Sequence, residues 1–383
     1  MSNMLFHSGA TALSTTKRIE WIDALRGFTM ILVVFSHIET LGFEMPRSTV
    51  NDFFSQFRMP LFFFISGFIA FRAGEVWNRQ YFTRQMLKKM RIQIIPTLFF
   101  GLLFAITVFS HRYHETTADS IFMFFDNPSK LGYWFTIALL AMFVIYYTVS
   151  FVLARCRMST RQIVLAGIAV VLYLISLAGS STIYRFPVAR WFSLFNIMLY
   201  FQFFVFGNIF ACYQERIFRF LQRPNIIGSI ILLFFGLYIA NSFLKGSSLM
   251  NSSVWKLTSK LLVEGVRYLG IMSVVSAFRH YEHAFSSNTR IGRSLQYIGK
   301  RTLDVYLLHY FLMPNLTMAG AFFCKVENTV LQASCSTALA LLVIAFCLLL
   351  SNFIRTSPTL AYYLFGVKRD KAHTTPSNNP DSK

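Results

Sequence analysis

Hydrophobic residues occur in long runs along this chain, separated by short polar stretches, from one end to the other. A run of about 20 apolar residues can cross a bilayer as a helix, which satisfies its own backbone hydrogen bonds. Ten runs are expected to be helices of this kind. Their approximate ranges are 21–41, 53–71, 92–110, 131–154, 162–179, 191–212, 226–244, 261–278, 302–323 and 336–354. The pattern predicts an all-α, polytopic membrane bundle.

Composition agrees with this pattern. Of the 383 residues, 55% are hydrophobic and only 14% are charged, a balance rare in soluble domains. A net charge of +20 would suit a nucleic-acid-binding protein, but the charges lie in short loops between the apolar runs. The lipid bilayer is therefore the expected partner, and nucleic acid is not.

Lysine and arginine alternate between the loops. The two tails and every second loop hold 24 of the 36 lysines and arginines, and the intervening loops hold nine. The positive-inside rule then predicts that both termini lie in the cytoplasm. We expect a cytoplasmic tail over 1–20, a membrane domain over 21–355, and a polar tail over 356–383 whose composition is typical of disorder. In the connection between the third and fourth runs, residues 121–125 are expected at the membrane interface.

The first apolar run contains a polar stripe. Arg26 and His37 are eleven residues apart, which places them within about 20° of one helix face and about 16 Å apart along the axis. Asp23 lies three residues before Arg26 and is expected to pair with it. Ionisable residues inside a membrane are usually functional. The alternative is an ion pair that packs helices together, with a hydrogen-bonded histidine beside it.

Five motifs follow one another in a fixed order. They are DALRGFTMILVVFSH at 23–37, FRMPLFFFISGF at 57–68, KKMRIQIIP at 88–96, GYWF at 132–135 and YIGKRTLDVYLLH at 297–309. In this order, on a chain with ten expected spans, they resemble the acyltransferase 3 family of integral membrane acyltransferases. The resemblance covers about 21–354.

This resemblance implies an activity. Family members transfer an acyl group, most often acetyl from acetyl-CoA, to hydroxyls of glycans such as O-antigens, capsules and exopolysaccharides. The chain is accordingly expected to be an O-acetyltransferase of a bacterial cytoplasmic (inner) membrane. Acyl-CoA would be a co-substrate, the acceptor a glycan or a lipid-linked glycan, and no tightly bound cofactor is expected.

The resemblance also implies roles for residues. Arg26 and His37 would be the essential catalytic pair, and the family's Arg-x-x-Arg element corresponds to Lys88–Arg91, with lysine in the first position. Chemically, histidine suits proton transfer near neutral pH, so His37 is expected to take the acceptor's proton. Arg26, with Lys88, Lys89 and Arg91, is expected to bind CoA. Direct transfer and an acetyl group carried on His37 both remain open.

Further residues are expected to line the site, most of them with a structural alternative. These are Asp23 (or a helix-packing ion pair), Arg58 (or a helix-start anchor), Ser66 (or close helix packing), Trp134 (or an interfacial aromatic), Tyr306, and His309 (or a structural hydrogen bond). Glu264 and Arg267 are expected to pair. Two His-x-x-His pairs, at 111–114 and 280–283, lack a third ligand, so no metal site is expected. Whether Cys324 and Cys335 form a disulfide stays open.

A second hypothesis comes from a different class of protein. A transporter of a glycan precursor or an organic acid would also place charges inside the membrane, with Arg26 binding the anionic solute. Donor dependence separates the two hypotheses, because an acyltransferase consumes acyl-CoA whereas a transporter moves its solute unchanged.

Overall fold

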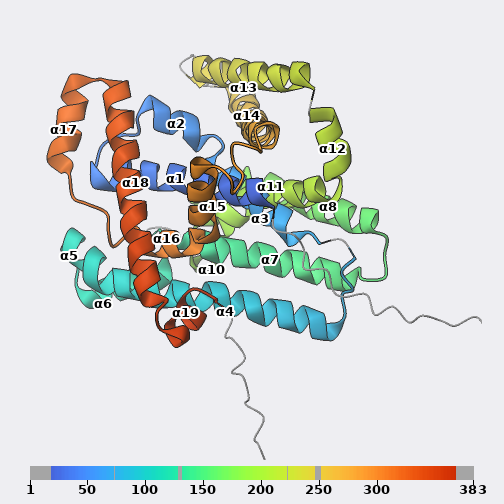
Figure 1. Cartoon of the computed structure of the whole chain (residues 1–383), viewed down its shortest axis with the longest axis horizontal. Coiled ribbons are helices and arrows are strands. Elements are labelled where there is room, and N and C mark those ends of the chain that lie inside the picture. Colours follow the sequence, from blue (N-terminus) through green and yellow to red (C-terminus); the bar gives the residue numbers. More distant parts are fainter. Residues whose placement is uncertain (1–18, 73, 128–131, 222, 246–251, 368–383) are drawn as a thin grey trace, which may run out of the picture.

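The computed structural model describes residues 19–367 except 73, 128–131, 222 and 246–251, and its regular elements there are helices (Figure 1). The α-helices are α1 (Glu20–His37), α2 (Thr49–Ser55), α3 (Arg58–Ala70), α4 (Arg79–Phe104), α5 (Ser110–Tyr113), α6 (Thr117–Asp126), α7 (Trp134–Val152), α8 (Met158–Ser176), α9 (Ser180–Ile183), α10 (Pro187–Trp191), α11 (Leu194–Cys212), α12 (Gln214–Leu221), α13 (Pro224–Lys245), α14 (Ser253–His280), α15 (Arg290–Lys300), α16 (Thr302–Leu308), α17 (Thr317–Val326), α18 (Thr329–Ile354) and α19 (Pro358–Leu364). Two π-helical turns, η1 (Ile38–Gly42) and η2 (Ala105–Phe109), extend α1 and α4.

The all-α membrane bundle is confirmed. Within the described ranges, nine helices are long and apolar enough to cross a membrane. They correspond to nine of the ten expected spans. Helix α6 covers the stretch expected to be interfacial.

The ninth expected span, 302–323, is wrong as a continuous helix. Helix α16 ends at Leu308 and α17 begins only at Thr317. Pro314 lies in the break, where a proline lacks a donor N–H and disfavours helical geometry in the residue before it.

The broken segment nevertheless follows α1 along its length. Thr302 accepts a hydrogen bond from Arg26, and the Leu316 N–H donates to the Gly42 carbonyl at 2.8 Å. Residues 302–316 therefore occupy the place of a tenth span. Irregular backbone at this depth is tolerated where protein buries it or where it lines a cavity.

Two further expectations differ from the structure. The basic run Lys88–Arg91, expected in a loop, lies inside α4, because that helix begins at Arg79 after its N-cap Asn78, whose side chain accepts from the Tyr81 N–H. Residues 358–364 of the expected C-terminal tail form α19, which packs on α4 through the stacked rings of Phe100 and Phe365. The tail beyond 367 and residues 1–18 lie outside the described residues.

Two pairs of helices cross with their backbones in contact at glycines. A Cβ on Gly27 of α1 would lie 2.0 Å from the Leu295 carbonyl oxygen of α15, and one on Gly299 would lie 1.8 Å from the Asp23 carbonyl oxygen. Gly67 of α3 and Gly207 of α11 meet in the same reciprocal way. Small residues allow such close approach in membrane bundles. The first crossing fixes the part of α1 that carries Asp23 and Arg26.

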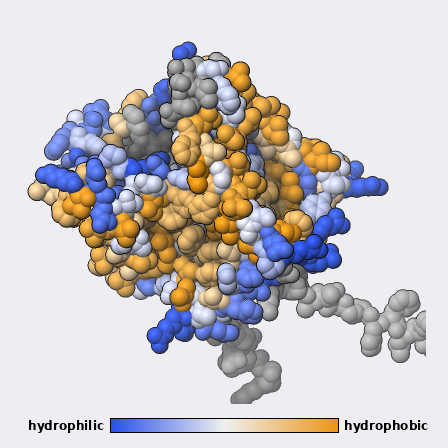
Figure 2. Space-filling view, turned by 90° about the horizontal axis from the view of Figure 1, so that it is seen from above, coloured by the Kyte–Doolittle hydropathy of each residue, from blue (hydrophilic) through white to orange (hydrophobic). Residues whose placement is uncertain are grey.

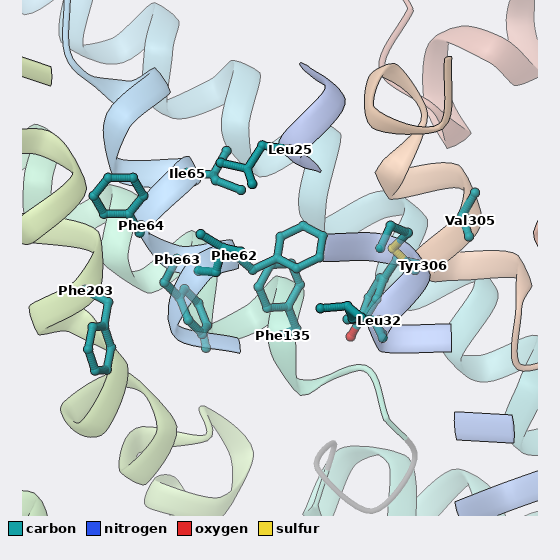
Figure 3. Close-up of a cluster of buried hydrophobic side chains, with 14 of the residues drawn as sticks. Leu25, Leu32, Phe62, Phe63, Phe64, Ile65, Phe135, Phe203, Val305 and Tyr306 are labelled. Carbon is teal, nitrogen blue, oxygen red and sulfur yellow. The ribbon is translucent and has the colours of Figure 1, made fainter. Parts of the chain in front are cut away.

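Aromatic side chains fill the space between α3, α7 and α16. The ring of Phe135 lies 5.2 Å from that of Phe62 and 5.4 Å from that of Tyr306, and all three meet in the centre of the cluster (Figure 3). Edge-to-face pairs of this kind add to the burial of apolar area. They hold three walls of the site described below in fixed positions.

The outer surface is also apolar. Figure 2 shows hydrophobic side chains across the middle of one face and hydrophilic ones at its periphery. On α13, Leu232 and Phe243 are 75% and 77% exposed. Exposed apolar patches of this extent are typical of a surface that lipid covers.

Candidate active site

A cavity of about 660 Å³ runs between α1, α3, α4, α7, α14 and α16. It brings together seven of the residues that the sequence proposes for the site. They are Arg26, His37, Arg58, Ser66, Lys89, Trp134 and Tyr306. Arg26 and His37 therefore share one helix face and one cavity, as their spacing predicts.

Arg26 is held at one end of this cavity. Its guanidinium donates to Thr302 Oγ1 at 2.8 Å and lies 3.7 Å from the Asp23 carboxylate. The expected pairing with Asp23 is confirmed, and Asp23 supports Arg26 without lining the cavity. The Lys89 ammonium also reaches this cavity and lies 3.4 Å from the centroid of the Phe143 ring, a cation–π contact.

His37 is held by residues from the break after α16. Its Nε2 lies 3.4 Å from the Tyr310 hydroxyl, and its ring centroid is 5.2 Å from that of His309. His309 is fully buried, and its Nδ1 donates to the Val305 carbonyl at 3.0 Å. His309 thus packs behind His37 instead of lining the cavity.

The GYWF motif is held against the same break. The hydroxyls of Tyr306 and Tyr310 both donate to the Gly132 carbonyl, at 2.7 and 3.3 Å. Gly132 has a φ of +83°, and a Cβ there would collide with the Tyr310 side chain. Only glycine fits this position without strain. Two residues after Gly132, Trp134 stacks on Tyr200 and lines the cavity.

A buried polar network anchors Arg58. Its guanidinium donates to Asn51 Oδ1 at 3.0 Å and to the Leu32 carbonyl at 3.4 Å. Asn51 in turn donates to Glu39, which is fully buried and also accepts from Ser48. Glu39 is not among the residues proposed from the sequence, although an acidic residue two places after His37 in an apolar run is a signal for a functional position.

Positive charge dominates the wall. The described residues that line the cavity include no carboxylate. They include five cations, which are Arg26, Arg47, Arg58, Lys89 and Arg267. Arg267 pairs with Glu264 at 2.5 Å, as expected, and this carboxylate lies outside the wall. Such a wall suits an anionic ligand.

Two residues of the expected CoA-binding cluster do not line the cavity. Lys88 is exposed on α4. The Arg91 guanidinium lies over the Tyr362 ring of α19, 3.8 Å from its centroid. Ser66 does line the cavity, where its hydroxyl donates to the Phe62 carbonyl at 2.9 Å.

The structure also describes the cysteines and the possible metal ligands. Cys324 and Cys335 are free thiols. Among the described residues, His, Cys, Asp and Glu form no group of three that could hold a metal ion.

A family model described as an acyltransferase domain, Acyl_transf_3, matches residues 19–352. The chain belongs to the acyltransferase 3 family. Neither the curated proteins nor the solved structures include a significant match to it. Membership of the acyltransferase 3 family, together with the long apolar helices, makes this protein a multi-pass membrane acyltransferase, in agreement with the first of the two hypotheses.

Proposed function

We propose that the protein transfers acetyl from cytosolic acetyl-CoA to a hydroxyl of an envelope glycan, from its place in a bacterial cytoplasmic membrane. The observation that carries the proposal is the shared cavity of Arg26 and His37, with five cations and no carboxylate among its described wall residues. Such a site suits both reaction partners. The cations suit CoA because it is polyanionic, and the buried imidazole is suited to taking a proton from the acceptor hydroxyl.

The donor enters at the Arg26 end. Arg26 and Lys89 bind its phosphates, and the positive-inside rule places this end of α1 nearest the cytoplasm. From Arg26 to His37 the helix rises about 16 Å, a distance that the pantetheine arm covers in an extended form. The thioester then lies beside His37, deep in the bundle.

Transfer takes place beside the His37 imidazole. His37 removes the proton of the acceptor hydroxyl while the hydroxyl oxygen forms a bond to the thioester carbon. The carbon–sulfur bond then breaks, and the CoA thiolate takes up the proton from His37. Arg58, fixed by Asn51 and the Leu32 carbonyl, supplies positive charge for the oxyanion that forms on the carbonyl oxygen.

The test uses inside-out membrane vesicles that enclose host envelope glycan and are supplied from outside with radiolabelled acetyl-CoA. Label is followed into glycan, and released CoA is measured in parallel. Wild type and His111→Ala, a control at an exposed histidine outside the cavity wall, should transfer label at the same rate, whereas His37→Ala should transfer none. Equal transfer by His37→Ala and wild type would contradict the role of His37.

A further inference from the structure

A second cavity, of about 810 Å³, lies beside the first one. It is formed by residues of α4, α6, α7, α8 and α11 and by the end of α10, and its wall is almost entirely apolar. Its volume falls within the range of about 300–1,000 Å³ typical of small-molecule sites. We refer to it as the apolar cavity, and to the cavity of Arg26 and His37 as the reaction cavity.

The two cavities share part of one wall. Gln93 of α4 and Thr136 of α7 line both of them. Thr136 is satisfied, since it accepts from Thr97 at 2.7 Å and donates to the Tyr133 carbonyl at 3.0 Å.

Gln93 differs from its neighbours in the shared wall. It is only 6% exposed, and its amide oxygen has no hydrogen-bond partner among the described residues. A buried polar group without a partner is costly, and such a group is a candidate contact for a ligand. Gln93 is therefore a candidate contact for a polar ligand group at the junction of the two cavities.

The apolar cavity lies away from the donor's end. On α4, its lining residues Gln93, Ile94, Thr97 and Leu98 all follow Lys89 in the chain. Its wall includes Phe122 and Phe125 of α6 and Phe192, all more than half exposed, and Asp126 of α6, which pairs with Arg190 of α10 at 2.9 Å. Exposed aromatic residues on short helices are typical of the membrane interface.

We propose that the apolar cavity binds the hydrocarbon chain of a lipid-linked acceptor, while the acceptor's hydroxylated headgroup enters the reaction cavity past Gln93. This inference rests on the proposed function and names its acceptor class. The occupant is the acceptor's chain and not the acyl chain of the donor, because the lining on α4 begins at Gln93, past Lys89, and the exposed aromatic residues of the wall come from α6 and the end of α10. A chain in this cavity keeps the headgroup hydroxyl close to His37 for transfer.

The first test uses the full-length protein in lipid nanodiscs and dodecyl glucoside with a photoreactive diazirine in its chain. Cross-links should concentrate on α6 and α7, and unlabelled dodecyl glucoside should compete for them while glucose should not. Ala141→Trp, which fills the apolar cavity, should lower this labelling about tenfold, as expected for a blocked site. Ala240→Trp, on the exposed face of α13, is the matched control and should leave it unchanged.

A second variant tests the contact with the headgroup. Gln93→Leu keeps the side chain's size and removes its amide, so half-maximal labelling by the glucoside should need about tenfold more probe. Labelling by photoreactive dodecanol, whose headgroup is a single hydroxyl, should change much less. Retained thermal stabilisation by acetyl-CoA shows that each variant is folded.

Three results would overturn the proposal. Labelling spread evenly over all lipid-facing helices and insensitive to Ala141→Trp would mean that only bulk lipid is in contact. Competition by palmitoyl-CoA but not by dodecyl glucoside would assign the cavity to the donor's chain. Equal effects of Gln93→Leu on both probes would remove the headgroup contact.

Because labelling needs no transfer, a failed acetyltransferase assay with retained, selective labelling would contradict the proposed function and not the assignment of the apolar cavity.

Discussion

At the scale of single residues, the position of the His37 imidazole depends on neighbours from another segment. His309 packs against it from behind, outside the cavity wall, and Tyr310, which lines the cavity, lies beside its Nε2. Both come from the break between α16 and α17, so the irregular backbone there supports the residue that is proposed to transfer the proton. His309 is in this sense a positioning residue.

We expect His309→Leu to lower turnover by up to about 100-fold, because a small displacement of a reacting group is costly. The apparent affinity for acetyl-CoA should stay unchanged, since Arg26 keeps its contacts with Thr302 and Asp23, and Lys89 keeps its contact with the Phe143 ring. Initial rates over a range of acetyl-CoA concentrations separate these two effects. A loss of acetyl-CoA binding with normal turnover would show that His309 has another role.

The network around Glu39 predicts a loss of stability. Asn51→Leu removes a donor to the buried Glu39 carboxylate and an acceptor for the Arg58 guanidinium. Losing hydrogen bonds to charged groups costs about 1.5–3 kcal/mol each, so the midpoint of thermal unfolding in detergent should fall. Asn225→Leu, at an exposed position of α13, serves as the control. An unchanged midpoint in Asn51→Leu would contradict the network's role.

Residue-level prediction from sequence succeeded where one helix supplied the pattern. Arg26 and His37 were placed on one face because eleven residues fix their relative direction, and Asp23 was paired by its spacing. Glu39 and Asn51 were missed because their partners come from separate helices. No spacing along one segment reports such contacts.

At the scale of helices, the crossings at glycines set the geometry of the site. Helix α1 meets α15 at Gly27 and Gly299, next to Asp23. The apolar runs predicted that these helices exist, since burial in lipid requires them. They did not predict the break after α16, because the sequence there is as apolar as a continuous span and only Pro314 interrupts it.

We expect Gly27→Ala to destabilise the protein by about 1–3 kcal/mol or more, because the added methyl group collides with the Leu295 carbonyl. Gly167→Ala on α8 is the matched control, since a Cβ there meets nothing within 4 Å. The measurement is the thermal unfolding midpoint of each variant in the same detergent. Equal midpoints for the two variants would mean that α1 and α15 do not cross this closely.

At the scale of the whole molecule, an even number of spans places both termini on the same side of the membrane. Nine long helices and the broken segment 302–316 preserve that even number. On that count the positive-inside rule still predicts that both termini lie in the cytoplasm. With that orientation, the proposed donor end of the reaction cavity would face the cytosol.

Native cysteines allow this orientation to be tested. Cys156 and Cys324 are exposed free thiols, the first after α7 and the second in α17. In single-cysteine variants, a membrane-impermeant maleimide added to intact spheroplasts should label Cys324 and should label Cys156 only after permeabilisation. The reverse pattern would invert the topology and with it the direction from which acetyl-CoA enters.

The central claim is that α1 separates donor binding from proton transfer, with Arg26 serving the first and His37 the second. The most direct test measures acetyl-CoA binding and acetyl transfer side by side in Arg26→Ala and His37→Ala, purified in the same lipid. Arg26→Ala should weaken acetyl-CoA binding about tenfold or more, through the loss of a charge-assisted contact. His37→Ala should bind acetyl-CoA as wild type does and transfer no acetyl. Equal loss of binding in both variants, or transfer that survives in His37→Ala, would contradict the account.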